Sequence, residues 1–275
     1  QAGPAALTAA LARDRLTFDD FLALLSPLAA ASPWREQIRL RAQRERLRHF
    51  GRTVRLYTPI YLSNACVNAC RYCGFRVGRG EPRRRLSLME IRAEAAVVRG
   101  FGIGSLLLVC GEDPEGMPLA RLVEAARELR QDFPFLAVEI YPQNEGGYRE
   151  LFAAGVHGVT LYQETYDRQL YAELHPHGPK RDYDARLAAI ACAARAGMFV
   201  IGIGALLGLR DWRREAVALA EHGRWLRKHY WRSRLQFSFP RLTPVPDFTP
   251  PAELDDAELE TMVLAFRCFF PEADI

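Results

Sequence analysis

The segment "LYTPIYLSNACVNACRYC", residues 56–73, joins an apolar run to three closely spaced cysteines. The run at 56–63 has the composition of a buried strand, and Cys66, Cys70 and Cys73 follow its end. A structural zinc site takes four protein ligands, and common iron–sulfur clusters take one thiolate for each accessible iron. The segment therefore predicts a metal site that is either completed from elsewhere in the fold or left open at one position.

Downstream of this segment, apolar runs alternate with amphipathic helical segments. Further strands are expected at 105–111, 136–142, 158–163, 198–206 and 235–240. Helices are expected at 87–100, 118–131, 146–154, 167–174, 183–196, 213–230 and 255–269. This alternation predicts parallel βαβ units. Six such units, with no G-x-G-x-x-G after the first strand, favour an α/β fold of the TIM-type (βα) barrel class over a Rossmann sheet.

The chain before the first strand contains helical patterns only. The segment 17–29 starts with a Thr cap, and 32–51 opens with Ser-Pro and closes on Gly, which are helix start and stop signals. We therefore expect an N-terminal helical extension at 1–51 and one barrel domain at 52–275.

Composition narrows the function classes. The 37 basic and 33 acidic residues leave a formal charge of only +4, so the basic segments 39–55 and 76–85 are interpreted as solvated surfaces rather than a nucleic-acid site. No apolar run has the length of a membrane span, and no signal peptide is recognisable. Six cysteines are too few and too uneven for a disulfide framework. We expect a cytoplasmic protein without membrane or nucleic-acid partners.

The C-x3-C-x2-C spacing suits three corners of a [4Fe–4S] cube, whose fourth iron would then be open to a small chelating molecule. The alternative is a zinc site completed by a remote residue such as Cys110 or His157. Zinc ribbons usually pair their cysteines as C-x2-C, so the cluster is the favoured interpretation.

The stretch "CVNACRYC", with an aromatic residue before its last cysteine, resembles the signature of the radical S-adenosylmethionine enzymes. The resemblance implies a [4Fe–4S] cluster on the three cysteines and S-adenosyl-L-methionine chelated to the open iron. It also implies a 5′-deoxyadenosyl radical released by reductive cleavage. Tyr72 would lie against the adenine, and Gly111 and Glu112 would bind the methionyl amine.

The stretches "LLLVCGEDP", "LHPHGPKRDYDARL" and "YWRSRLQFSFPRL" resemble the aromatic amino-acid lyases of this superfamily, most of all the tyrosine lyase of thiamine thiazole biosynthesis. This implies cleavage of the Cα–Cβ bond of L-tyrosine to 2-iminoacetate and p-cresol, with 5′-deoxyadenosine and methionine formed. The alternatives are the hydrogenase-maturation tyrosine lyase, which supplies CO and cyanide, and more distantly a tryptophan lyase. The implied partners are a reductant such as flavodoxin or ferredoxin and a possible complex with thiazole synthase.

The same resemblance assigns further cofactor contacts. Glu164 would bind the ribose hydroxyls, and Arg186 would pair with the methionyl carboxylate. Gly202 and Gly204 would let the nucleoside approach the strand. Structural alternatives stay open here, because Glu164 and Arg186 can form a simple ion pair and the glycines can serve packing alone.

The substrate contacts expected from the resemblance are Ser238 and Arg241, at the end of the last predicted strand. These lyases continue with a further strand and an arginine for the substrate carboxylate, so we expect the C-terminal part of the barrel to be missing after "FFPEADI" (269–275). Of the remaining candidates, the cysteines are expected to be buried, the tyrosines to be core or rim residues, and the histidines to be solvated or to support a site residue. They are Cys110, Cys192, Cys268, Tyr162, Tyr166, His175 and His177. Two other classes stay open, a metal-dependent RNA-binding protein and a zinc-stabilised scaffold.

Overall fold

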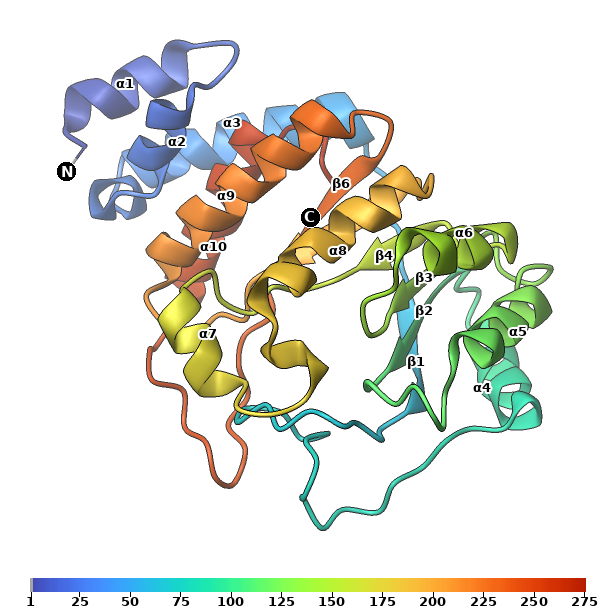
Figure 1. The fold of residues 1–275 in the computed structure, drawn as a ribbon. Coiled ribbons are helices and arrows are strands. Elements are labelled where there is room, and N and C mark those ends of the chain that lie inside the picture. Colours follow the sequence, from blue (N-terminus) through green and yellow to red (C-terminus); the bar gives the residue numbers. More distant parts are fainter. Residues whose placement is uncertain (1) are drawn as a thin grey trace.

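The computed structural model describes residues 2–275, and its centre is one sheet of six parallel strands (Figure 1). The spatial order follows the chain order, with every neighbouring pair parallel. The strands are β1 (Thr58–Ser63), β2 (Ser105–Cys110), β3 (Phe135–Glu139), β4 (Gly158–Thr160), β5 (Val200–Gly204) and β6 (Arg234–Ser238). All six predicted strands are confirmed, and so is the barrel-type α/β class.

Seven helices follow the strands and lie on the outside of the sheet (Figure 1). They are α4 (Leu88–Gly100), α5 (Leu119–Leu129), α6 (Glu145–Ala153), α7 (Arg168–Leu174), α8 (Tyr183–Arg195), α9 (Trp212–His229) and α10 (Asp256–Phe269). Each lies within two residues of a predicted boundary, because local capping sets the ends. At α4, for example, Ser87 and Glu90 form a capping box.

The N-terminal extension consists of α1 (Pro4–Ala12), α2 (Phe18–Leu24), the 3₁₀ turn η1 (Pro27–Ala30) and α3 (Trp34–Phe50). The single helix predicted at 17–29 is wrong, since α2 ends at Leu24 and Pro27, which has no N–H to donate, begins a separate turn. The Thr17 cap and the stop at Gly51, where φ is +61°, are confirmed. The domain boundary at residue 51 stays a prediction.

The extension is attached to the barrel mainly through α3 and α10. Arg35 and Arg39 of α3 both pair with Glu260 of α10. Buried Arg41 donates to the carbonyl oxygens of Ala10 and Leu11, at 3.0 and 3.2 Å, and so ties α1 to α3. Part of the basic segment 39–55 is therefore structural.

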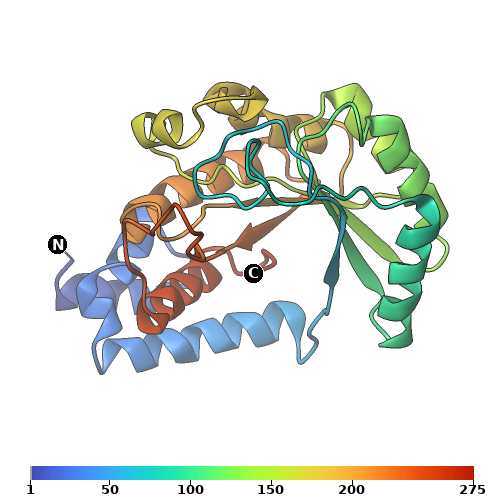
Figure 2. The same cartoon turned by 90° about the horizontal axis from the view of Figure 1, so that it is seen from below.

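Among residues 2–275, β1 and β6 do not pair, so the sheet is an open arc (Figure 2). Near the chain end, Asp274 pairs with β6: its N–H donates to Leu235 O at 2.9 Å, and its carbonyl accepts from Phe237 N at 2.9 Å. The strands β2 and β5 are buried along their whole length, as expected where helices cover one face and the barrel interior the other.

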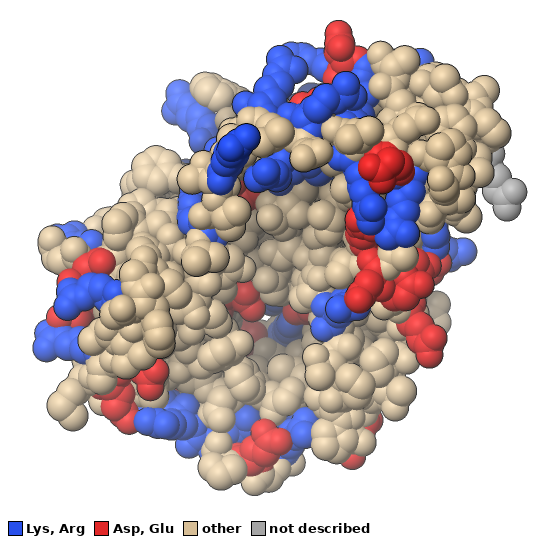
Figure 3. All heavy atoms as spheres, turned by 180° about the vertical axis from the view of Figure 1, so that it is seen from behind, with Lys and Arg blue, Asp and Glu red and all other residues tan. Residues whose placement is uncertain are grey.

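The arginines of the segment 76–85 are held in ion pairs and hydrogen bonds. Arg76 pairs with Asp247 at 2.6 Å, and Arg85 pairs with Asp113 at 2.5 Å. Figure 3 shows blue and red side chains interspersed around a hollow on one face of the molecule. No helix within residues 2–275 is long and apolar enough to cross a membrane.

Candidate active site

A cavity of about 350 Å³ lies at the C-terminal ends of the strands, where barrel enzymes carry their chemistry. It brings together residues from the cysteine loop (residues 64–83), from the ends of β2 to β4 and from the start of α8. Eight of the predicted site residues line it: Cys66, Cys70, Tyr72, Cys73, Gly111, Glu112, Glu164 and Arg186.

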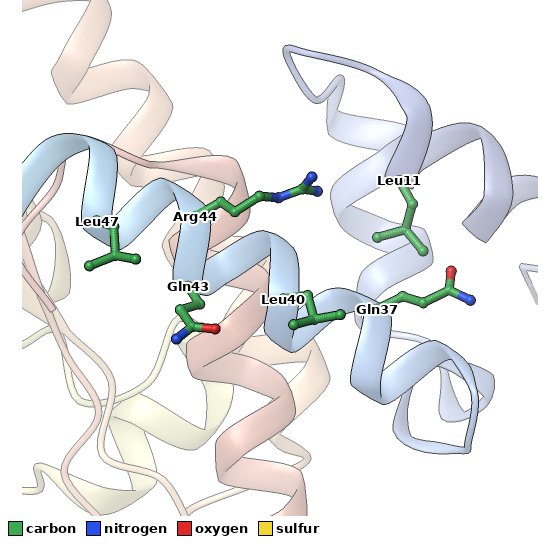
Figure 4. A pocket seen from close by; sticks show the side chains of 6 residues that line it. All are labelled: Leu11, Gln37, Leu40, Gln43, Arg44 and Leu47. Carbon is green, nitrogen blue, oxygen red and sulfur yellow. The ribbon is translucent and has the colours of Figure 1, made fainter.

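A second hollow, of about 530 Å³, runs along α3 on the N-terminal extension (Figure 4). Leucine side chains, two amides and a guanidinium group line it: Leu11, Gln37, Leu40, Gln43, Arg44 and Leu47. No carboxylate, thiol or imidazole lines it, so the reactive groups are concentrated in the first cavity.

The cysteine loop is organised around Asn68, whose side chain is buried. Its amide Nδ2 donates to Glu112 Oε2 at 2.6 Å and lies 3.6 Å from Cys66 Sγ. Its backbone N–H also donates to Cys66 Sγ, at 3.4 Å. Asn68 therefore couples the first cysteine to the carboxylate at the end of β2.

The connector between α7 and α8 (residues 175–182) clamps this loop. The N–H of Lys180 donates to Asn68 Oδ1 at 2.9 Å, and the N–H of Ala69 donates to His177 O at 3.1 Å. Gly178 makes the close approach possible, because its φ is +94° and an added Cβ would lie 2.3 Å from Asn68 Oδ1. The loop is thus shaped by a segment about a hundred residues later in the chain.

Tyr72 is held by a buried histidine. Its hydroxyl lies 2.7 Å from His175 Nε2, and His175 Nδ1 lies 2.7 Å from the carbonyl of Tyr171. A carbonyl only accepts, so Nδ1 carries the proton and Nε2 accepts from Tyr72. Burial lowers the pKa of His175 to about 4 and keeps it neutral. Of the two roles expected for His175, solvated or supporting a site residue, the structure shows the second, because packing under the cysteine loop removes it from water.

Glu164 has a left-handed backbone, with φ of +70°, at the position where β4 leaves the sheet. Such a conformation is costly for a residue with a side chain and is concentrated at functional sites. Glu164 Oε1 lies 2.6 Å from Lys180 Nζ and 3.6 Å from Arg186 Nη2. Burial alone would raise the pKa of Glu164, but the charges of Lys180 and Arg186 outweigh it and hold the pKa below its usual value. The ion pair is therefore present, and it faces the cavity.

The glycines differ in what approaches them. At Gly111 an added Cβ would lie 2.2 Å from the carbonyl oxygen of Ala65, so the cysteine loop itself requires glycine there. Gly202 and Gly204 do not line the cavity. Their missing side chains leave room for Thr160 Oγ1 and for the carbonyl of Ser238, at 2.7 and 2.6 Å from an added Cβ. Packing between strands accounts for both.

The two predicted substrate residues lie outside the cavity wall. Arg241 is paired with Asp256 at 2.6 Å, and its side chain is 47% exposed. Ser238 is half-buried and lies near the hydroxyl of Tyr162, which does line the cavity. The structure therefore brings Ser238 to the edge of the site and leaves Arg241 in solvent.

Among the lining residues that were not predicted, three carry an amide or a charge, namely Asn68, Glu139 and Lys180. Asn68 lies in "CVNACRYC", where the neighbouring cysteines were the only local signal. Lys180 lies in "LHPHGPKRDYDARL", where the only local signal was a Gly-Pro turn. A carboxylate within the apolar run "LAVEIYP" was the available signal for Glu139. Burial raises the pKa of Glu139 to about 7.

The cysteines are all free thiols. Within the described part of the chain, no three His, Cys, Asp or Glu side chains lie close enough together to hold a single metal ion. His157 precedes β4, at the opposite end of the sheet from the cysteines, and stacks on Phe135 and Phe199. It is therefore wrong as a fourth zinc ligand. Cys110 does line the cavity, while Cys268 is buried elsewhere.

Comparison with known proteins gives one family match and three similar proteins. The Radical SAM superfamily profile matches residues 60–220. The chain is 42% identical to 2-iminoacetate synthase of Escherichia coli K12, over 97% of this chain and 71% of that protein. It superposes on the FeFe-hydrogenase maturase HydG from Carboxydothermus hydrogenoformans with a TM-score of 0.89 and 30% identity, over 98% of this chain and 63% of the maturase. Methylornithine synthase (PylB) follows with a TM-score of 0.73 and 26% identity, over 98% of this chain and 77% of that one.

Proposed function

The chain belongs to the radical S-adenosylmethionine superfamily, and we propose that within it the protein is a tyrosine lyase. It cleaves the Cα–Cβ bond of L-tyrosine to 2-iminoacetate and p-cresol, with 5′-deoxyadenosine and methionine as co-products, for thiazole formation in thiamine biosynthesis. The observation that carries the proposal is the cavity lined by three thiols, Glu112, Glu164 and Arg186, in a chain 42% identical to a 2-iminoacetate synthase over almost its whole length.

Enzymes of this superfamily use a [4Fe–4S] cluster and S-adenosylmethionine. The residues present fit this pair, because Cys66, Cys70 and Cys73 reach one cavity from one loop and leave one of four irons without a protein ligand. When bound, the pair supplies an adenosyl radical that can take a hydrogen atom from the substrate.

We assign the cofactor contacts to groups already fixed in place. Glu112, oriented by Asn68, accepts hydrogen bonds from the methionyl amine. Arg186 pairs with the methionyl carboxylate, for which its planar guanidinium provides two parallel donors. Glu164 accepts from the ribose hydroxyls, and Lys180 keeps it ionised.

The remaining wall of the cavity excludes water from the reacting atoms. Tyr61, Phe75, Tyr141 and Tyr162 line it. A reactive radical takes whichever hydrogen lies within reach, so the chain must hold the substrate in one orientation. We keep Ser238 as a candidate substrate contact because it lies near Tyr162, which lines the cavity; the role of Arg241 stays a prediction.

The second candidate function is that of the hydrogenase-maturation tyrosine lyase. It is favoured by the superposition on HydG over 98% of the chain. The two functions share tyrosine cleavage and differ in product, so assaying CO and cyanide in the tyrosine reaction separates them.

The test is anaerobic reconstitution with iron and sulfide, followed by incubation with S-adenosylmethionine, dithionite and tyrosine. Formation of 5′-deoxyadenosine together with p-cresol supports the proposal. A colourless protein that contains zinc without acid-labile sulfide, and that makes neither product, contradicts it.

We further propose a flavodoxin- or ferredoxin-type electron donor, because the cofactor chemistry consumes an electron. 2-Iminoacetate hydrolyses readily, so direct transfer to thiazole synthase would protect it. A reducing compartment such as the cytoplasm suits a site that depends on free thiols.

A further inference from the structure

Glu139, the last residue of β3, lines the cavity and has no cationic partner within residues 2–275. The other two carboxylates of the cavity are engaged, Glu112 by Asn68 and Glu164 by Lys180 and Arg186. The hydroxyl of Tyr162, two residues after β4, lies near Glu139 in the same cavity wall. Glu139 is thus the cavity carboxylate left available to a ligand.

The surroundings of Glu139 favour a group that can both accept and release a proton. Burial has the largest effect on its pKa, which it raises to about 7, and the negative charge of Glu164 adds to this. The Tyr162 hydroxyl and the cations Lys180 and Arg186 lower the pKa. On the β2 side, the cavity is lined by Val109, Cys110, Gly111 and Glu112. A carboxyl group with a pKa near the working pH is well matched to proton transfer.

The proposed reaction requires such a transfer. An amino acid arrives at neutral pH with an ammonium group, which has no lone pair. In the proposed reaction, the hydrogen atom that tyrosine loses comes from its amino nitrogen. This removal is easier from the neutral amine, because the lone pair stabilises the radical that forms. One proton must therefore leave the nitrogen before the hydrogen atom does.

We propose that Glu139 is the catalytic base that accepts this proton from the substrate ammonium group. One N–H bond breaks and leaves its electron pair on nitrogen, while an O–H bond forms on the Glu139 carboxylate, so no oxidant or reductant is consumed. This role rests on the proposed tyrosine lyase function. It also gives a role to a cavity carboxylate that forms no ion pair within residues 2–275.

The test compares Glu139→Gln, which keeps the shape and hydrogen bonding but cannot take a proton, with Glu139→Asp, which keeps the carboxylate. Glu124→Gln, on the exposed side of α5, is the matched control. The reconstituted proteins are assayed for p-cresol and for 5′-deoxyadenosine across pH 6 to 9, with tyrosine at several concentrations. Iron content and S-adenosylmethionine affinity report whether each variant is correctly assembled.

Loss of a general base typically reduces the rate about 10²- to 10⁴-fold, so we expect kcat for p-cresol to fall by at least about 100-fold in Glu139→Gln. The remaining rate should rise with pH as solvent deprotonates the substrate amine. Abortive formation of 5′-deoxyadenosine should persist, Glu139→Asp should recover part of kcat, and Glu124→Gln should match the wild type.

Three results overturn the inference. The first is p-cresol formation by Glu139→Gln within about threefold of wild type and with the same pH profile. The second is a loss of p-cresol accompanied by a loss of iron or of S-adenosylmethionine binding in both Glu139 variants, which would make the role structural. The third is a wild-type protein that cleaves S-adenosylmethionine but makes no p-cresol, which removes the proposed function and this role with it.

Discussion

The two sides of the barrel mouth differ in how firmly their polar side chains are held. On the cysteine-loop side, Asn68, Lys180 and Glu164 are joined by hydrogen bonds and ion pairs with little exposure to water. On the β6 side, Arg241 is 47% exposed and pairs with Asp256, whose side chain is 89% exposed. The cysteine-loop side is therefore preorganised before any ligand binds, which lowers the entropic cost of binding. The β6 side has no comparable support.

The largest effect is expected from the cysteines themselves. Cys73→Ser should abolish cluster assembly and activity, because two thiolates remain for a cluster that needs three. Iron, acid-labile sulfide and visible absorbance measure this loss. Cys192→Ser, on α8 and outside the cavity, is the control and should retain all three signals. Equal loss in both variants would contradict the special role of the cysteine loop.

The next effect tests the contact between the cysteine loop and β2. Gly111→Ala would place a Cβ 2.2 Å from the carbonyl oxygen of Ala65, so the loop must move. Overpacking of this kind costs about 1–3 kcal/mol of unfolding free energy. Denaturant unfolding and cluster content measure it. Gly80→Ala, where nothing lies within 4 Å of an added Cβ, should leave both unchanged. A tolerated Gly111→Ala would show that the loop is not rigidly placed.

Asn68→Ala tests the coupling of Cys66 to Glu112. A hydrogen bond to a charged group contributes about 1.5–3 kcal/mol, so S-adenosylmethionine affinity should fall by about 10- to 100-fold. Equilibrium dialysis measures affinity, and electron paramagnetic resonance of the reduced cluster reports the lost donor near Cys66. Asn64→Ala removes an amide from the same loop that bonds only to its own segment, and should have little effect on either.

A smaller effect concerns acid stability. His175 has a pKa of about 4 in the folded chain against 6.5 as its ordinary value, so the unfolded state binds more protons between these limits. Stability is therefore lost as pH falls from about 6.5 to 4, at up to about 1.4 kcal/mol per pH unit for this group. Urea unfolding at several pH values measures the slope. His175→Gln should flatten it, and an unchanged slope would contradict the neutral, buried state. His222, also with a pKa of about 4, contributes separately.

The smallest effect is expected on the β6 side. Arg241→Ala removes an exposed ion pair and should change the free energy of unfolding by less than about 1 kcal/mol. Its S-adenosylmethionine affinity should stay within about twofold of wild type. Thermal unfolding and equilibrium dialysis measure these quantities. A tenfold or larger fall in tyrosine turnover would show that Arg241 leaves Asp256 and contacts the substrate.

The fold was predictable because its signals are local. Apolar runs identified all six strands, and the helical patterns between them placed the ends of α4 to α10 within two residues. The one wrong helix, at 17–29, failed where a proline interrupts an otherwise helical pattern. The cysteine spacing was equally readable, since all three thiols lie within eight positions.

The site was only partly predictable. Strand ends in a parallel sheet meet at one edge, so Glu112 and Glu164 were expected at the mouth and are found there. The partners that orient them could not be derived, because Asn68 lies 44 residues from Glu112 and Lys180 lies 16 residues from Glu164 in the chain. No local pattern shows whether an arginine side chain points into the cavity or into solvent. Arg241 is an example, because it pairs with exposed Asp256.

By itself, the sequence determined the strand–helix alternation, the cluster-type cysteine spacing and the family, because periodicity, capping and motif spacing act over a few residues. Only the tertiary structure decided the left-handed backbone of Glu164, its pairing with Lys180 and the unpaired state of Glu139. These depend on which distant segments share one buried cavity. Burial there raises the free-energy cost of every unpaired charge, and so determines which groups are paired and which stay available for chemistry.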